Sequence, residues 1–320
     1  MAGEIDAAMS PSAAAASRGP IDPGLTPPLL RWYEDRRGAY PWRGSRDPYA
    51  VLVSEVMLQQ TQAARVVPVY RRFLERFPDV ATLAGADRAD VVRAWEGLGH
   101  NRRAVAISEA ARAILRDHDG RVPADVPVLR SLPGVGPYTA AAVAAIAFGV
   151  AVVGVDTNVR RVVSRVAAVA DVSPLELDGI ARTWLGTTDP SVWHQAVMDL
   201  GRTVCRPRAR CDACPLAARC PSAGVAAVST PGRRQGRFEG SSRQVRGAIV
   251  RELRSLRSSS LGGLARRTGA NLEDTHRAVI ALASDGVVTA GEEAVCGSPR
   301  GRVRLAGQTG VGRGRVATTR

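Results

Sequence analysis

The spacing of apolar residues most strongly limits what this chain can fold into. From Pro28 to Val204 they recur with the period of an α-helix, and no segment keeps the strict alternation of a half-buried strand. Pro, Gly and Asp residues divide the stretch into segments of helix length. The pattern predicts an all-α domain with helices at 28–36, 48–62, 64–76, 87–94, 101–117, 126–131, 137–148, 157–168, 176–186 and 191–202.

Changes in composition mark the limits of this helical domain, which we place at residues 28–222. Residues 1–27 are rich in Ala, Pro and Ser and lack the basic start and apolar core of a secretion signal, so we expect a disordered tail. Residues 223–240 have the Ala, Gly, Ser, Pro and Arg content of a linker. Residues 309–320 are expected to form a second disordered tail.

A second, smaller domain is expected at residues 241–308. Two strand-like pieces, Gly286–Ala290 and Arg302–Leu305, follow three helix-like segments, and this is the order of a winged helix. A small α+β packing domain that never touches DNA is the alternative. The three helix-like segments are residues 242–257, 261–268 and 271–284.

The charges of the chain are carried unevenly and include no lysine, so all 44 basic residues are arginines. Residues 1–222 hold 27 Arg against 23 acidic residues, whereas residues 223–320 hold 17 against 7. This asymmetry indicates a polyanionic partner, with nucleic acid the first candidate. The absence of lysine excludes any chemistry that needs a lysine side chain.

Four of the five cysteines stand close together, at Cys205, Cys211, Cys214 and Cys220. Such a cluster is typical of a metal site in a reduced compartment, so we expect a cytoplasmic protein. Zinc ribbons usually arrange two Cys-x-x-Cys pairs, whereas here one central pair has two outliers, which favours an iron–sulfur cluster over zinc. Cys296 is expected to be a buried or incidental thiol.

One apolar stretch, Tyr138 to Val155, carries no charge over 18 residues. Its length approaches the ~20 residues that a bilayer requires. Alanine makes up much of it and two glycines interrupt it, so we expect a buried helix and an apolar crossing rather than a membrane contact.

Two carboxylates occupy positions suited to catalysis. Glu55 lies in a segment whose apolar neighbours cover nearly every face, so its pKa is expected to rise into the range of a general acid. Asp156 follows an apolar run and opens an amphipathic helix, where one carboxylate could stabilise a positively charged sugar. A structural glutamate paired with an arginine and an ordinary helix N-cap are the alternatives.

The string Leu132-Pro133-Gly134-Val135-Gly136 immediately precedes a predicted helix. Its glycines allow a tight turn and the close approach of another backbone, and amides at the helix N-terminus can hold a phosphate. We interpret the string as the hairpin of a helix-hairpin-helix DNA-binding element, with Gly134, Val135 and Gly136 at the DNA. An ordinary helix–helix turn is the alternative.

Together with further strings, these motifs resemble the endonuclease III superfamily of DNA glycosylases, and within it the MutY-type adenine glycosylases. The resemblance covers about residues 28–222 and implies a six-helix barrel with a cluster domain that holds a 4Fe-4S cluster on the four cysteines. The further strings are Tyr40-Pro41-Trp42-Arg43, VSEVMLQQTQ from Val53 to Gln62, Trp95-Glu96-Gly97-Leu98-Gly99, Asp156-Thr157-Asn158 and His194 to Gly201.

The resemblance also assigns roles. It implies that Glu55 protonates the adenine N7 and that Asp156 stabilises the oxocarbenium-like sugar, with Tyr138 and Asn158 in support. Extrusion of the base is needed because the glycosidic bond is inaccessible inside the duplex. The base pocket would contain Trp42, Arg43 and Gln195, and the duplex wedge would contain Gln60, Thr61, Leu98 and His100.

Position 138 separates the subfamilies, because strand-cleaving members carry a lysine there. Tyr138 and the absence of lysine predict a monofunctional enzyme that leaves an abasic site. Three features depart from the family pattern. The first cysteine gap is one residue short, His100 stands where a tyrosine is common, and residues 223–320 are too short and too poor in aromatics for the usual 8-oxoguanine-recognition domain.

These observations predict a cytoplasmic, monomeric adenine DNA glycosylase that acts on double-stranded DNA with adenine opposite 8-oxoguanine or guanine, and on no small-molecule substrate. A thymine or uracil mismatch glycosylase is the first alternative, because related enzymes of that kind also have a tyrosine at the hairpin. A DNA-binding iron–sulfur regulator that uses the winged helix is the second, although it leaves both carboxylates without a role.

Overall fold

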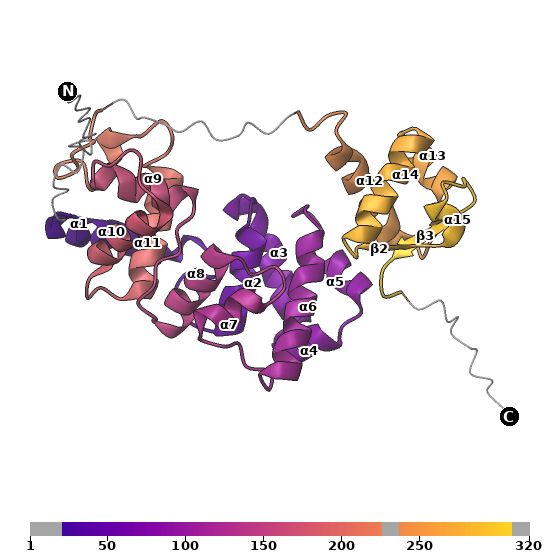
Figure 1. The fold of residues 1–320 in the computed structure, drawn as a ribbon, viewed down its shortest axis with the longest axis horizontal. Coiled ribbons are helices and arrows are strands. Elements are labelled where there is room, and N and C mark those ends of the chain that lie inside the picture. The colour runs from indigo at the N-terminus through magenta and orange to yellow at the C-terminus, as the bar shows by residue number, and fades with distance from the viewer. Residues whose placement is uncertain (1–20, 226–236, 309–320) are drawn as a thin grey trace, which may run out of the picture. The chain divides into compact units, whose positions relative to one another are not determined.

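The computed structural model describes residues 21–225 and 237–308, which form two compact units (Figure 1). The predictions of a tail at residues 1–20, of most of the linker and of a tail from residue 309 lie outside the described residues. The first unit contains η1 (Pro23–Leu25), α1 (Thr26–Glu34), α9 (Thr157–Val166), α10 (Pro174–Leu185), α11 (Pro190–Thr203) and η3 (Cys211–Ala213).

The first unit starts earlier than the sequence predicts. Residues 21–27 were expected in a disordered tail, and this is wrong, because Asp22 caps η1 by accepting a hydrogen bond from the Gly24 amide at 2.8 Å. The same carboxylate pairs with Arg219 at 3.0 Å. The contact that orders this segment comes from the far end of the unit, so local composition does not reveal it.

The second unit contains the remaining helices of the predicted helical domain. α2 packs against both α3 and α8, and α4 packs against α6 (Figure 1). No helix within the described residues is long and apolar enough to cross a membrane. The helices are η2 (Arg37–Ala39), α2 (Pro48–Leu58), α3 (Ala63–Arg76), α4 (Val80–Gly85), α5 (Arg88–Ala94), α6 (Arg102–Asp117), α7 (Val126–Ser131) and α8 (Pro137–Phe148).

Helix α2 ends at Leu58, four residues before the predicted end at 62. The guanidinium of Arg103 in α6 donates to the Val56, Met57 and Gln59 carbonyls at 2.9, 2.8 and 2.6 Å. A helix leaves its last carbonyls without backbone partners, and here a buried arginine satisfies them. The turn that follows α2 is therefore fixed by a side chain from another helix.

The second unit also contains the predicted winged helix. Its antiparallel sheet has the strand order β1-β3-β2, with Val288 opposite Leu305 and Ser259 opposite Val303. The sequence did not predict the two-residue strand β1 or the short helix α15. The elements are α12 (Ser242–Ser255), β1 (Ser259–Ser260), α13 (Leu261–Thr268), α14 (Leu272–Ser284), β2 (Val288–Ala290), α15 (Glu292–Val295) and β3 (Arg302–Leu305).

The winged helix contacts α5 and the start of α6 through an arginine of α12. Arg254 donates to the Val92 carbonyl at 3.3 Å and to Asn101 Oδ1 at 3.2 Å. Arg93 donates in return to the Arg254 carbonyl at 3.3 Å. These bonds hold the small domain against the helical part of the same unit.

Candidate active site

Glu55 lies in the middle of α2, and its side chain is 5% exposed. Helix α2 begins at an Asp47 cap, whose carboxylate accepts from the Tyr49 and Ala50 amides, and apolar residues on almost every side of the helix are buried. The predicted enclosure of Glu55 is confirmed. A carboxyl group kept out of bulk water is suited to hold a proton for a departing base.

Asp156 is the N-cap of α9, which was the alternative to a catalytic role in the sequence analysis. Oδ1 accepts from the Asn158 and Val159 amides at 2.8 and 2.7 Å, and Oδ2 accepts from Asn158 Nδ2 at 2.8 Å. Desolvation by burial raises the pKa of Asp156 above its usual value, while these hydrogen bonds and the charge of Arg161 oppose the rise. Capping leaves the carboxylate rigidly placed, which electrostatic stabilisation of a cation requires.

Arg161 links this cap to the cysteine loop within the first unit. Its guanidinium donates to Asn158 Oδ1 and to the Gly201 carbonyl, both at 2.7 Å, and from Nε to the Cys205 carbonyl at 2.7 Å. Gly201 permits the approach, because a Cβ there would lie 2.8 Å from the Asn158 Cβ. The support of Asp156 and the loop of the first cysteine thus share one side chain.

The predicted hairpin connects α7 and α8. Gly134 has φ +77°, and a Cβ there would lie 2.7 Å from the Ala106 Cβ, so only glycine fits. The side-chain amide of Gln59 donates to the Gly134 carbonyl at 3.2 Å and to Thr139 Oγ1 at 3.1 Å. These residues and the half-buried Tyr138 line an open cavity of about 520 Å³.

The tips of the two predicted wedge loops are exposed and strained. Gln60 and His100 have φ +53° and +44°, values that non-glycine residues adopt at a cost in energy and often at functional sites. Thr61 is half-buried. Leu98 is only 4% exposed, so its side chain belongs to the core of the described structure and its contact with DNA stays a prediction.

Arg103 supports both wedge loops from beneath. It donates to Thr61 Oγ1 at 2.9 Å and to the Leu98 and Gly99 carbonyls at 3.5 Å, besides the α2 carbonyls described above. Burial lowers the pKa of Arg103 to about 10. Sequence reasoning missed this residue, although an arginine on the apolar stripe of α6, one turn before the buried Ile107, was a signal.

The three predicted pocket residues are divided between the units. Trp42 is buried and stacks on Tyr40 with 5.1 Å between ring centroids, and Arg43 is half-buried beside it in the chain. Gln195 is buried in α11, where its Oε1 accepts from the Tyr33 hydroxyl at 2.6 Å. Each is fixed in its own unit, so a shared pocket stays a prediction.

The two candidate catalytic carboxylates are also divided between the units, because Glu55 belongs to the second unit and Asp156 to the first. Within the second unit, Glu55 and Tyr138 lie on the packed helices α2 and α8. Within the first, Asp156, Asn158 and the cysteine loop are joined by hydrogen bonds. The meeting of the two halves at one nucleotide stays a prediction.

The four clustered cysteines line one small cavity in the first unit. Burial, together with the charges of the other three cysteines, raises the pKa of Cys214 to about 11. Arg165 donates to the Cys205 sulfur at 3.3 Å. Across the described ranges, no three His, Cys, Asp or Glu side chains form a group that could hold a single metal ion.

This donor set fits a polynuclear cluster better than one ion. Four thiols around a common cavity can bind a cluster of several irons, in which each thiolate ligates a different iron atom. A single tetrahedral ion requires all four ligands within about 2.3 Å of one point. Cys296 is exposed in the winged helix, so the interpretation of it as a buried thiol is wrong and that of an incidental thiol stays a prediction.

Comparison with known proteins first defines the class. The family described as "HhH-GPD superfamily base excision DNA repair protein" matches residues 53–185. A thermostable thymine-DNA glycosylase is similar in structure, with 30% identity, a TM-score of 0.56 and coverage of 61% of this chain and 92% of that one. An endonuclease III–DNA complex gives 26% identity, a TM-score of 0.53 and coverage of 61% and 91%.

A sequence relative then narrows the class. The adenine DNA glycosylase of Mycolicibacterium smegmatis is 45% identical over 232 residues, which are 71% of this chain and 79% of that protein. The chain therefore belongs to the adenine DNA glycosylase family of the helix-hairpin-helix superfamily. It is accordingly an enzyme, and the interpretation as a regulator is not retained.

Proposed function

We propose that this enzyme hydrolyses the N-glycosidic bond of adenine paired with 8-oxoguanine or guanine in double-stranded DNA. The observation that carries the proposal is the buried carboxyl group of Glu55 on α2, in a helix packed against the one that follows the hairpin. Family membership supports the choice of adenine, and solved relatives bound to DNA support the duplex partner. We further propose that it acts as a monomer in the cytoplasm.

The proposed reaction begins when the adenine nucleotide is turned out of the duplex. Glu55 donates its proton to N7, and the bond between C1′ and N9 breaks with its electron pair going to the purine. Asp156 stabilises the positive charge that develops on the sugar. Water then adds at C1′ and loses a proton, which leaves an abasic site and free adenine.

The product is expected to be an uncut strand. A strand-cleaving glycosylase attacks C1′ with an amine, and no lysine side chain exists in this chain to supply one. Tyr138 occupies the position concerned, at the start of α8 in the open cavity beside the hairpin. We propose that its hydroxyl supports the reacting nucleotide without forming a bond to it.

Cys205, Cys211, Cys214 and Cys220 would hold a 4Fe-4S cluster in this proposal. Each of the four thiolates would ligate one iron of such a cluster, and the chain between the first and last cysteine would thereby be fixed. Arg165 supports the arrangement, because its guanidinium reaches the Cys205 sulfur and its carbonyl accepts from the Ser222 hydroxyl at 2.8 Å.

A thymine or uracil mismatch glycosylase is the second candidate, favoured by the structural similarity to the thymine-DNA glycosylase. Incubation of the purified chain with duplexes that carry one A·8-oxoguanine, A·G, T·G or U·G pair separates the two. Release of adenine from the first two duplexes, with breaks only after alkali, is the expected result. Release of thymine or uracil alone would replace the proposal with the second candidate.

A further inference from the structure

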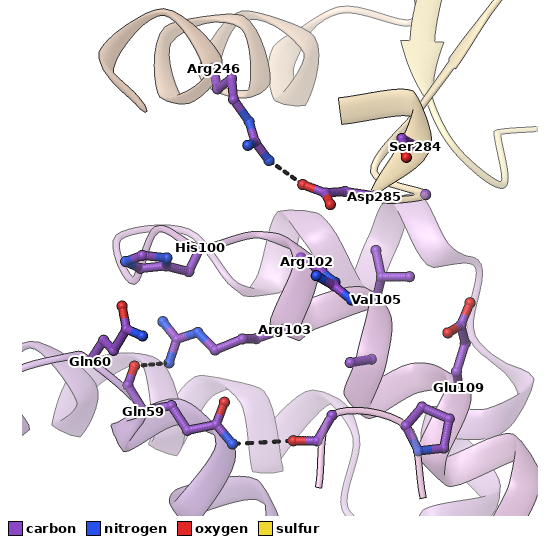
Figure 2. A pocket seen from close by; sticks show the side chains of 14 residues that line it. Gln59, Gln60, His100, Arg102, Arg103, Val105, Glu109, Arg246, Ser284 and Asp285 are labelled. Atoms are coloured by element: carbon purple, nitrogen blue, oxygen red, sulfur yellow. Dashed lines mark hydrogen bonds and ion pairs between the residues drawn. The ribbon is translucent and has the colours of Figure 1, made fainter. Parts of the chain in front are cut away.

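A cleft of about 860 Å³ lies inside the second unit, with the wedge loops on one side and the winged helix on the other (Figure 2). The wedge side presents Gln60, His100 and Arg102, and the winged-helix side presents Arg246 and Asp285. The proposed mechanism uses nothing from the winged-helix side. Yet Arg254 bonds to Val92 and Asn101, so this side is held in place by direct contacts.

Positive charge gathers around the tip of the second wedge loop. Desolvation and the charges of Arg103, Arg243 and Arg246 lower the pKa of His100, so three guanidinium groups act on one imidazole. Two of them, Arg243 and Arg246, belong to the first two turns of α12. Arg246 also lines the cleft, and Arg243 lies three residues before it on the same helix.

The two carboxylates in the cleft lining are each balanced by one arginine, so the excess positive charge of the lining comes from its other arginines, Arg102 and Arg103. Glu109 is paired with Arg88 at 2.9 Å, and Asp285 is paired with Arg246 on the winged-helix side of the cleft (Figure 2). Arg102 is exposed and forms no side-chain ion pair with any residue that the structure describes. A cationic concave surface beside a wedge in a duplex suits phosphate groups of DNA.

The part of a winged helix that usually enters a DNA groove is unsuited here. It is the second helix of the helix-turn-helix, which corresponds to α14. The exposed start of α14 carries Glu273 and Asp274, and both pair with Arg277. One arginine balances only one of these two carboxylates, so this end of α14 keeps a net negative charge and does not offer the basic face that nucleic-acid binding requires.

We propose that the cleft receives the sugar–phosphate backbone of the strand opposite the excised adenine, with Arg243 and Arg246 of the winged helix binding its phosphates. The choice of strand rests on the proposed function, because Gln60 and His100 then stand in the gap that the extruded adenine leaves. The winged helix thus extends the duplex-binding surface of the glycosylase through α12 and the turn after α14. Its recognition helix takes no part.

The test is the salt dependence of duplex binding by the full chain. The probe is a duplex with guanine opposite 2′-fluoro-2′-deoxyadenosine, whose glycosidic bond resists cleavage, and anisotropy is measured between about 50 and 300 mM salt. Each phosphate contact contributes about 0.9 to the slope of log K against log salt. Arg243→Ala with Arg246→Ala should lower the slope by about 1.8 and weaken binding roughly tenfold or more at about 100 mM salt.

Matched variants separate the site from general charge. Arg267→Ala removes one positive charge from α13, where Arg267 is exposed and paired with Glu252, and should leave the slope unchanged. Arg246→Lys keeps the charge and should retain most of the slope, which controls for misfolding. An unaltered slope in the double variant, or an equal loss in Arg277→Ala, would overturn the proposal.

This measurement does not depend on catalysis. If the wild-type chain releases no adenine from any mispair, the proposed function fails, but the uncleavable duplex still reports whether α12 binds phosphates. If adenine is released and the slope does not depend on Arg243 and Arg246, the proposed function stands and the cleft proposal fails.

Discussion

The guanidinium of Arg161 donates from Nη2 to Asn158 Oδ1 at 2.7 Å, and this bond decides which way the Asn158 amide faces. With its oxygen held by the arginine, the amide presents Nδ2 to Asp156 Oδ2 at 2.8 Å. The same guanidinium holds the carbonyl of Cys205. A disturbance of the cysteine loop therefore reaches the carboxylate through one arginine and one asparagine.

Arg161→Gln should lower the single-turnover rate of adenine excision by about 10–100-fold, the range typical of groups that orient a functional ligand. The reason is that Asn158 loses the bond that fixes its amide. Rates are measured with enzyme in excess over an A·G duplex, and iron content is measured on the same samples. Arg160→Gln removes the same charge from the neighbouring position and should excise at the wild-type rate.

The raised pKa of Asp156 predicts an acid limb in the rate of excision. The carboxylate must be ionised to stabilise a cation, so activity falls as the pH drops through its pKa. Because burial raises that pKa, the fall begins at a higher pH than for an ordinary aspartate. Single-turnover rates on an A·G duplex between about pH 4 and 8 locate the limb.

Removal of a positive charge near Asp156 should move this limb. Arg161 lowers the pKa of Asp156, so Arg161→Gln is expected to shift the acid limb to higher pH, whereas Arg160→Gln leaves it in place. A limb at the same pH in all three proteins would mean that another group controls the rate in acid.

Glu55→Gln keeps the shape of the buried side chain but removes the proton that it can give up. General acid catalysis contributes about 10²–10⁴-fold, so excision should fall by at least 100-fold while duplex binding is retained. Glu75→Gln changes an exposed glutamate of α3 and serves as the control. Substantial excision by Glu55→Gln would remove Glu55 from the role of acid.

The cysteine assignment predicts a contrast between two thiols. Cys214→Ser should lower the iron bound per chain and weaken the loop that Arg161 and Arg165 hold, because one of four ligands is lost. Cys296→Ser changes an exposed thiol in the other unit and should keep the full iron content. Iron analysis and visible absorption of the purified proteins measure both, and equal iron in the two variants would contradict the assignment.

Local sequence was sufficient to predict most helices, but not the helix ends that are fixed by side chains from distant parts of the chain. Asp125 and Pro137 mark the starts of α7 and α8, and Gly149, in the left-handed conformation, marks the end of α8. The early end of α2 depends on Arg103, which is more than forty residues away in the chain. The sequence did not predict helix α4, because its six residues are too few to show a helical period.

In the candidate site, too, local sequence reveals some residues and only the fold reveals others. Glu55 and the four cysteines could be identified because their type and spacing carry the chemistry. Arg161 and Arg246 could not, because only the fold brings Arg161 to the Cys205 carbonyl and Arg246 to the cleft beside the wedge loops. The arginine content of the chain made single functional arginines harder to recognise.

The two exposed glycines of the hairpin provide a matched pair. Gly134 has φ +77° and no room for a Cβ, whereas Gly136 has φ −81° and no atom within 4 Å of a Cβ placed there. Gly134→Ala combines a left-handed backbone with a clash against Ala106 and should lower the free energy of unfolding by about 2–4 kcal/mol. Gly136→Ala should lower it by about 1 kcal/mol or less, because alanine is a poorer N-cap than glycine.

Urea denaturation compares the two variants, and duplex binding is measured where both remain folded. Gly134→Ala should also bind the duplex less tightly, because the turn must move away from Ala106 and draws the hairpin with it. Gly136→Ala should bind nearly as the wild type does. Equal losses of stability in the two variants would show that the hairpin yields to an added methyl group, and that the close approach of Gly134 to α6 does not hold it in place.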